Sequence, residues 1–359
     1  MKLTINTVSL QALVAKAMKG ASCNKMLPLT NMMAIQLKDN ALTLVTTDAT
    51  NYLYVEQDKV LGEDFYVVVQ TDIFSKLVSK LTCENVTMVL DGSALTVKGN
   101  GSYKIELPLD EEGELIKFPD PLNKPFTPTE EAELHLSTAK LILGTAKAAL
   151  SKDADGSCYT GYYMGQRVVA TDTFVMCGIK IPIFEQPVLL APETLDLLGV
   201  FGEEKIAVAH DGDTIIFTTP TCSVYGKCMD CLGDFQIDVI QELLDDTYES
   251  VCKIAKGELL QLLDRLSLFV GQYDKNSIYL TFTQDGVQVD SKQANSSELI
   301  PYVSSSGFKP FRCCVDIEVL TQQVKASSAD QFELHYGKDN AVKLVDGNVT
   351  QVVALTEEE

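Results

Sequence analysis

Three stretches of this chain of 359 residues place their apolar positions at the spacing of one helix face, and strand-like alternation follows each stretch. The apolar positions of the three helix faces are Leu10, Leu13, Val14 and Ala17, then Leu141, Leu143, Ala146 and Leu150, then Leu259, Leu262, Leu263 and Leu266. Alternating positions predict strands at Val86–Leu90 and Leu95–Lys98, joined by the hairpin signal Asp91-Gly92-Ser93. The pattern therefore predicts helices and strands in a recurring order.

A short motif at a strand end supports this repetition. Leu42–Asp48, which ends in Thr-Thr-Asp, returns as Arg167–Asp172, which ends in Ala-Thr-Asp, and Ile278–Asp285 is a weaker third copy. Each copy is followed by a second helix-like segment, at residues 71–77, 192–198 and 315–320. The period of roughly 110–125 residues makes each copy long enough to be a domain.

Two stretches interrupt the pattern and suggest domain boundaries. Phe118–Pro128 is rich in proline, which neither a helix interior nor a central strand accommodates, and Leu243–Ser250 is acidic and polar. We therefore predict three domains, at residues 1–122, 129–245 and 250–359. Each would pack two helices on one face of an antiparallel sheet, which is an α+β fold.

The termini, apolar runs and cysteines limit where the protein works. No apolar run approaches the roughly 20 residues that a membrane span needs. Met1–Ile5 has the pattern of a strand and lacks the apolar centre of a signal peptide. The ten cysteines are scattered along the chain. We therefore expect reduced thiols, a cytoplasmic location and no contact with membranes.

The net charge of −21 argues against binding of duplex DNA by an evenly charged surface, but the charge is not even. Predicted helices at 6–19, 71–81 and 137–152 carry Lys16 and Lys19, then Lys76 and Lys80, then Lys140, Lys147 and Lys152. Among these helices only the second carries an acid, Asp72 at its start, whereas the helix at 193–204 carries four. The lysines predict a basic surface on an acidic protein, or are ordinary solvated lysines on amphipathic helices.

We find no catalytic, metal or cofactor motif. The three histidines fall in separate predicted domains, and Cys228-Met229-Asp230-Cys231 is a lone C-x-x-C without a suitably spaced fourth ligand for zinc. Gly99-Asn100-Gly101 lacks the Lys-Ser/Thr of a phosphate loop. Asp48 and Asp172 each end a strand, where an aspartate that caps local backbone amides is favoured over a catalytic carboxylate pair.

Several of these segments resemble the bacterial DNA polymerase III beta subunit, the sliding clamp, or a divergent phage or plasmid-type member of that family. Val169–Asp172 resembles the family's strand ending in Ala-Thr-Asp, and Val45–Asp48 nearly does. Lys25–Asn31 resembles the segment after the family's first helix, and Val188–Pro192 resembles the strand before the second helix of domain two. The resemblance covers nearly the whole chain in order.

The resemblance implies a DNA polymerase processivity factor. Three repeated clamp domains per subunit would form a head-to-tail homodimeric ring, with helices around double-stranded DNA. A clamp loader would open the ring, and loader and polymerase would bind through short hydrophobic peptides. The family is not enzymatic and needs no cofactor. An alternative is a non-encircling peptide-binding scaffold with the same triplicated fold. A hydrolase using Asp48, Asp172 and a cysteine ranks far lower, because nothing places a nucleophile beside a base.

The resemblance also implies three sets of site residues. The DNA-facing set is Lys16, Lys19, Lys25, Lys76, Lys80, Lys140, Lys147 and Lys152. The partner-peptide pocket is Thr171, Thr173, Phe174, Met176, Ile240, Leu243, Val352, Ala354 and Leu355. The dimer interface is Tyr103, Ile105 and Leu107 of an edge strand, with Leu268 and Phe269, for which core packing is an equal alternative.

The pocket sequence departs from the family pattern at two places. The family usually has Gly-His-Arg-Leu after Thr-Asp, where this chain has Thr173-Phe174-Val175-Met176. The family often ends in Met-Pro-Met, where this chain has Ala354-Leu355-Thr356. Methionine and aliphatic residues still suit a short hydrophobic peptide, so the resemblance predicts the place of the pocket and leaves its preferred peptide open.

Overall fold

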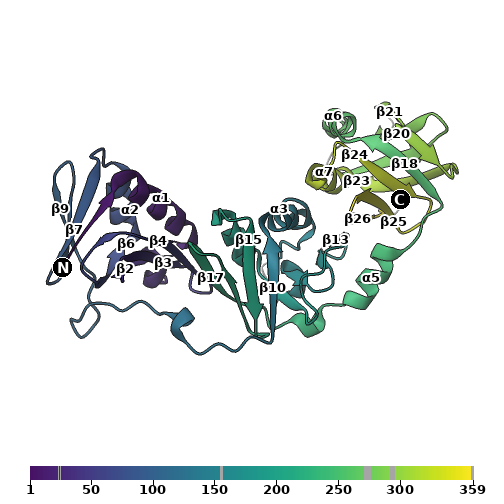
Figure 1. Cartoon of the computed structure of the whole chain (residues 1–359). Coiled ribbons are helices and arrows are strands. Elements are labelled where there is room, and N and C mark those ends of the chain that lie inside the picture. The colour runs from purple at the N-terminus through teal and green to yellow at the C-terminus, as the bar shows by residue number, and fades with distance from the viewer. Residues whose placement is uncertain (23, 25, 154–156, 271–275, 292–295, 357–359) are drawn as a thin grey trace. The chain divides into compact units, whose positions relative to one another are not determined.

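The computed structural model describes residues 1–22, 24, 26–153, 157–270, 276–291 and 296–356, which form two compact units (Figure 1). Unit 1 is Met1–Leu136 with Glu193–Cys228, and unit 2 is Ser137–Pro192 with Met229–Glu359. Each of the four sheets lies within one unit. Both units contain part of the middle repeat, so the division into three domains stays a prediction.

Unit 1 contains a five-stranded and an eight-stranded sheet. The first has the order β5 (Leu61–Gly62), β1 (Lys2–Asn6), β7 (Asn85–Asp91), β8 (Ala94–Lys98), β9 (Ser102–Glu106). The second has the order β10 (Glu130–His135), β15 (Lys205–His210), β16 (Thr214–Thr218), β17 (Cys222–Lys227), β4 (Tyr52–Gln57), β3 (Ala41–Thr47), β2 (Met32–Lys38), β6 (Phe65–Gln70). The helical elements are α1 (Thr7–Ala17), η1 (Met18–Gly20), η2 (Pro28–Asn31), α2 (Thr71–Ser79), η3 (Pro121–Asn123), α4 (Pro192–Asp196) and η6 (Leu197–Val200).

Unit 2 contains a nine-stranded and a four-stranded sheet. The first has the order β14 (Val188–Leu190), β11 (Tyr162–Met164), β12 (Val168–Thr171), β13 (Val175–Ile179), β26 (Val349–Ala354), β25 (Ala341–Asp346), β24 (Gln331–Tyr336), β18 (Ser250–Ala255), β22 (Ser304–Ser306). The second has the order β21 (Ser297–Pro301), β20 (Gly286–Ser291), β19 (Ser277–Phe282), β23 (Phe311–Asp316). The helical elements are α3 (Leu136–Thr145), η4 (Ala146–Ala149), η5 (Cys158–Thr160), η7 (Leu232–Asp234), α5 (Ile237–Asp245), α6 (Lys256–Ser267) and α7 (Ile317–Ala326).

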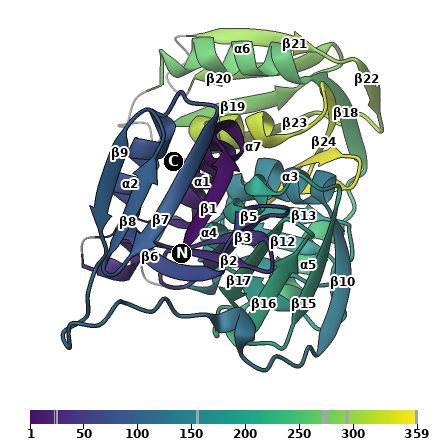
Figure 2. The same ribbon diagram turned by 60° about the vertical axis from the view of Figure 1, so that its left-hand side comes forward.

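The α+β prediction is confirmed in both units. Neighbouring strands pair antiparallel, as β3 does with β4 and β13 with β26. Two predicted apolar helix faces are buried, at Leu10 and Leu13 of α1 and at Leu262 and Leu263 of α6. The face predicted for the helix at 137–152 was wrong in α3, where Leu141 and Leu143 are half-buried and Ile142 is buried instead. Helices α1 and α2 pack side by side in unit 1, and α6 and α7 do so in unit 2. Figure 2 shows α6 lying along β21 and β20. Within the described residues, no helix is long and apolar enough to cross a membrane.

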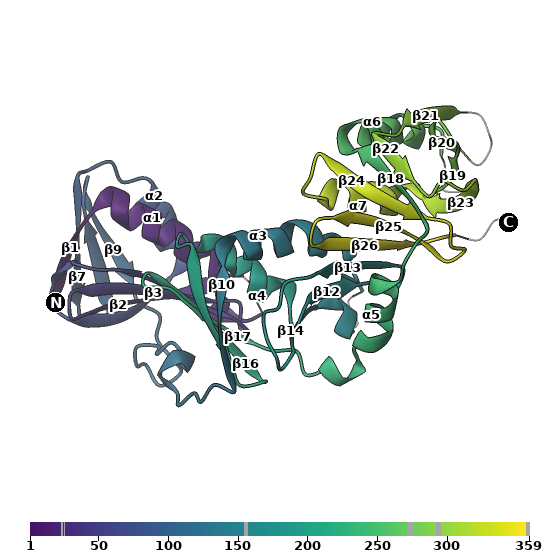
Figure 3. The same ribbon diagram turned by 45° about the vertical axis from the view of Figure 1, so that its right-hand side comes forward.

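The nine-stranded sheet carries helices on both faces (Figure 3). Successive residues of a strand point to opposite faces, and β13 shows both neighbours at once. The thiol of Cys177 contacts Thr145 of α3, whereas Gly178 lies under Leu244 of α5. The helices α3 and α5 therefore cover opposite faces of one sheet. In unit 1 the proline-rich segment packs on the eight-stranded sheet, where Phe118 lies in one apolar cluster with Val45 and Tyr54, and the Tyr54 Oη donates to Asp120 Oδ1 at 3.0 Å.

The repeated Thr-Asp motif forms the same turn in each unit. Thr171 Oγ1 donates to the carbonyl of Val175 at 2.7 Å, and Asp172 Oδ1 accepts from the amides of Phe174 and Val175 at 2.9 and 2.7 Å. Asp48 likewise accepts from two amides, at 2.8 and 2.7 Å. The prediction that these aspartates cap local backbone amides is confirmed.

The third residue of each turn has a left-handed backbone. Thr173 has a φ of 79° and Ala49 has a φ of 89°, in the region that favours glycine. Thr173 stands where the resembled family usually carries glycine, so this replacement keeps the turn at a conformational cost.

Some predicted boundaries were wrong. The helix predicted at 137–152 ends in η4 at Ala149, and the one predicted at 193–204 ends in η6 at Val200. The stretch predicted as a linker from Leu243 begins inside α5, a helix that the sequence analysis missed. Its apolar positions are buried only because the nine-stranded sheet lies beneath them, and that sheet joins strands distant in sequence.

Replacing Thr173 with glycine should raise the free energy of unfolding by roughly 0.5–1 kcal/mol, because relief of the left-handed strain exceeds the extra backbone entropy of glycine in the unfolded chain. Ala49→Gly should act in the same direction. The control Thr218→Gly, in the extended strand β16, should lower the stability. Urea unfolding measures all three, and a Thr173→Gly variant less stable than wild type would contradict the strain at this turn.

Candidate nucleic-acid interface and partner pocket

The predicted DNA-facing lysines are exposed wherever the structure describes them. Unit 1 carries them on neighbouring elements, Lys16 on α1, Lys19 in η1, Lys76 on α2 and Lys80 at its C-terminal end. Unit 2 carries Lys140 on α3, Lys147 in η4 and Lys152 just after it. Lys25 lies outside the described residues. Lys76 also pairs with Asp72 one turn away at 3.1 Å, so part of its charge is balanced locally.

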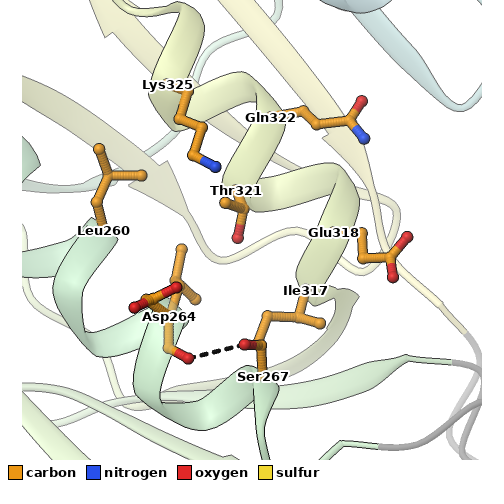
Figure 4. Close-up of a pocket in the computed structure, with 9 residues that line it drawn as sticks. Leu260, Asp264, Ser267, Ile317, Glu318, Thr321, Gln322 and Lys325 are labelled. Carbon is orange, nitrogen blue, oxygen red and sulfur yellow. Dashed lines mark hydrogen bonds between the residues drawn. The ribbon is translucent and has the colours of Figure 1, made fainter.

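The two helix pairs differ in the charges that line the grooves between them. The α1–α2 groove, of about 450 Å³, is lined by Lys76 and by uncharged residues. The α6–α7 groove, of about 350 Å³, holds Asp264, Glu318 and Lys325 (Figure 4). In it Ser267 Oγ donates to the carbonyl of Asp264 at 2.7 Å. Because phosphates are attracted to lysines and repelled by carboxylates, α1–α2 is the better anion surface.

Helix α4 is acidic, as the sequence of the helix predicted at 193–204 indicates. Glu193 and Asp196 of α4 are exposed, and they line a groove of about 460 Å³ together with Lys19 and Asp48. The positive charge thus lies on α1, η1, α2 and α3–η4, whereas α4 and the α6–α7 groove are acidic or mixed.

The structure brings three of the predicted pocket residues into one apolar cluster on the α5 face of the nine-stranded sheet. Met176 of β13, Ile240 of α5 and Val352 of β26 pack together with Tyr163 and Phe235. The rings of Tyr163 and Phe235 stack with centroids 5.3 Å apart. The sequence analysis missed both aromatic residues and the helix. Phe235 is visible in the sequence just before α5, but Tyr163, the ring on which it stacks, lies 72 residues earlier, so the sequence alone does not pair them.

The other predicted pocket residues lie outside this cluster, most of them in or next to the Thr-Asp turn between β12 and β13. The side chain of Phe174 is 72% exposed, and its carbonyl accepts from the amide of Ala354 at 2.9 Å. Thr171 is buried, Thr173 is exposed and Leu243 is half-buried on α5. Leu355 packs elsewhere, against the apolar core between the sheets of unit 2 and the helices α6 and α7.

The predicted interface residues separate into buried and exposed side chains. Ile105 and Leu107 are buried within unit 1, and Tyr103 is exposed on β9, the edge strand of the five-stranded sheet. Leu268 and Phe269, at the end of α6, are 81% and 56% exposed. Core packing of Leu268 and Phe269 is therefore wrong, and an unpaired strand edge and two exposed apolar side chains are available for association.

The chemistry of the described residues offers no activated nucleophile. Burial raises the pKa of the Cys177, Cys222 and Cys228 thiols to about 12, which keeps them protonated near neutral pH. The Asp48 and Asp172 carboxylates are engaged by backbone amides. In the part of the chain that the structure describes, no three His, Cys, Asp or Glu side chains converge on a possible metal position.

Comparison with known proteins identifies the fold. Residues 1–115 match the family model described as the N-terminal domain of the DNA polymerase III beta subunit. No curated protein matches the chain. The structure is similar to the DNA polymerase sliding clamp of Bacillus subtilis, at 15% identity, with 100% of each chain covered and a TM-score of 0.82.

Two further solved structures agree. The beta subunit of DNA polymerase III from Thermotoga maritima is 18% identical, covers 100% of each chain and has a TM-score of 0.82. That from Pseudomonas aeruginosa is 14% identical, covers 99% of this chain and 100% of its own, and has a TM-score of 0.84. The chain therefore has the sliding-clamp fold along its whole length, and the sequence match to the family covers its N-terminal part.

Proposed function

We propose that this protein is a sliding clamp, a non-catalytic processivity factor that encircles duplex DNA and tethers the replicative polymerase. The observation that carries the proposal is the full-length likeness to solved clamps, joined to the family match of residues 1–115. Exposed lysines on α1, η1, α2 and α3–η4, in a chain with a net charge of −21, support the same function.

A topological link explains how an acidic protein stays on DNA. A closed ring cannot dissociate sideways, so it needs few phosphate contacts and can slide. The acidic remainder of the surface discourages DNA from binding outside the ring. A polymerase bound to the ring stays near the primer end through effective concentration, with no new catalytic step.

Ring closure requires the same two surfaces in each subunit of a head-to-tail homodimer. A heterologous contact closes only when its rotation returns to the start, and a subunit built of similar repeats favours such a rotation. We assign one surface to the β9 edge with Tyr103 and the other to Leu268 and Phe269. Apolar side chains this exposed are stabilised by burial against a partner.

We assign binding of the polymerase and clamp-loader subunits to the cluster of Met176, Ile240 and Val352, with the exposed Phe174 two residues before Met176. Flexible and aliphatic side chains beside an exposed aromatic ring suit a short hydrophobic peptide. Truncation before Val352 is a poor test, because β26 pairs with both β13 and β25 and lies inside the sheet. Single substitutions test this pocket more cleanly.

The runner-up function is a non-encircling peptide-binding scaffold. It is favoured by the acidic α4 and by the carboxylates of Asp264 and Glu318 in the α6–α7 groove, which are poor neighbours for phosphates. The mass of the protein in solution separates the two functions, because a scaffold needs no ring.

Replacing Lys76, Lys80, Lys140 and Lys147 with glutamate should weaken the electrostatic affinity of the protein for duplex DNA, and so lower the amount that is loaded on nicked circular DNA, with the loss steepest at low salt. Each lysine that contacts a phosphate contributes roughly 0.9 to the salt slope, so the slope should also fall. The control replaces Lys38, Lys59, Lys117 and Lys227, which are exposed outside the helices. Equal losses in both variants would contradict the assigned DNA-facing surface.

Light scattering should find the wild-type protein near twice 39.3 kDa. Leu268→Lys with Phe269→Lys should give the monomer mass, because the change places two charges in the proposed contact. The far-ultraviolet circular dichroism should not change, since both side chains are exposed. A wild-type monomer at all concentrations would favour the scaffold, and an intact dimer in the double variant would remove these residues from the interface.

A further inference from the structure

A buried lysine holds the C-terminal end of α5. Lys343 of β25 is 2% exposed, and its Nζ donates to the carbonyls of Leu244 at 3.0 Å and Asp246 at 2.5 Å. The last carbonyls of a helix lack partners within the helix and carry partial negative charge. The lysine therefore caps α5 from a strand about a hundred residues further along the chain.

The position of Lys343 is unusual for a charged residue. Its neighbours Val342 and Leu344 point into the core beneath α6 and α7, so Lys343 points to the opposite face, toward α5. Burial lowers the pKa of its ammonium, which marks the cost of removing the charge from water, and nearby Asp246 opposes this shift. An aliphatic side chain would avoid that cost. The two hydrogen bonds that the ammonium donates to carbonyls at the end of α5 offset this cost.

Weaker contacts reinforce the same end of α5. Asp245 pairs with Arg167 at 2.7 Å and with Lys180 at 3.3 Å, and Asp246 pairs with Lys338 at 2.5 Å. These pairs are partly exposed, so each contributes little. Lys343 is the buried member of the group and has no solvent to replace the bonds that it makes.

The contact beneath the helix leaves α5 little freedom. Leu244 lies directly on the backbone of Gly178, where an added Cβ would come within 2.6 Å of Leu244 Cδ1. One turn earlier, Ile240 packs with Met176 and Val352. The place of the Ile240 side chain is thus set by how the end of α5 is seated on β13 and bonded to β25.

We propose that Lys343 is a positioning residue of the peptide pocket. By bonding the carbonyls of Leu244 and Asp246 it seats α5 on the sheet and holds Ile240 as the wall of the pocket. This inference rests on the proposed function, because it takes the cluster of Met176, Ile240 and Val352 as the place where partners bind. The lysine acts through α5 and does not touch the peptide.

The test compares three variants of the full chain. Lys343→Met keeps the length of the side chain but removes its charge and its hydrogen-bond donors, whereas Lys343→Arg keeps the charge and the donors. The control Lys338→Met removes the partly exposed ion pair with Asp246 and a cation–π contact with Tyr248. The measurements are hydrogen exchange of the α5 amides, binding and release of a labelled pentapeptide with adjacent Leu and Phe residues, and solution mass. The peptide matches the apolar lining of the pocket.

In Lys343→Met, the α5 amides should exchange roughly tenfold faster, because local opening of the helix becomes easier. The peptide should bind roughly tenfold more weakly, mainly through faster release. Lys343→Arg should restore most of the exchange protection of α5 and most of the peptide affinity. Lys338→Met should keep the exchange rate and the affinity within about twofold of wild type. The solution mass should not change in any of the three variants.

Unchanged exchange of α5 in Lys343→Met, or faster exchange with unchanged peptide affinity, would overturn the proposal. If Lys343→Met does not fold, Gly178→Ala replaces it in the test, because the added Cβ displaces Leu244 while Lys343 is kept. Unchanged peptide binding by Gly178→Ala would also overturn the proposal. A wild-type chain that binds no peptide would remove the pocket and this inference together. Ring formation is judged separately by the solution mass.

Discussion

The ladder between β13 and β26 is the interaction on which the functional features of unit 2 depend. It pairs strands more than 170 residues apart, with Met176 opposite Val352, and so joins the middle and last repeats into one sheet. One face of that sheet carries α3, and the other carries α5 with the proposed pocket. The pairing of β17 with β4 joins the first and middle repeats of unit 1 in the same way.

The lysines and the acidic residues of the chain lie on different surfaces. The chain is acidic overall, yet its lysines are exposed on α1, η1, α2 and α3–η4. A protein that holds DNA by enclosing it can tolerate this weak and uneven attraction, whereas one that binds DNA by contact alone needs many paired phosphates. The groove between α6 and α7 holds two carboxylates and one lysine, so it attracts phosphates less than the α1–α2 groove does.

Local signals predicted much of the fold, and long-range contacts decided the rest. The helix faces of α1 and α6, the hairpins and the Thr-Asp turns depend on neighbouring residues, and the sequence predicted them. The face predicted for α3 was wrong at Leu141 and Leu143, because the helix buries Ala139, Ile142 and Thr145. Helix α5 was missed because Ile240 and Leu244 lie in an acidic stretch and find their apolar partners in distant strands. Lys343 sits in a strand between apolar neighbours, a pattern that indicates an exposed residue unless both faces of the sheet are known to be covered.

The central claim is that the protein holds DNA by enclosing it, and linearisation of the DNA tests this most directly. The protein is loaded on nicked circular DNA by its clamp loader, separated from free protein by gel filtration, and the circle is then cut once. A ring predicts that the protein stays on the intact circle and leaves within minutes from the cut ends. Equal retention on circular and linear DNA, or none on either, would contradict the account.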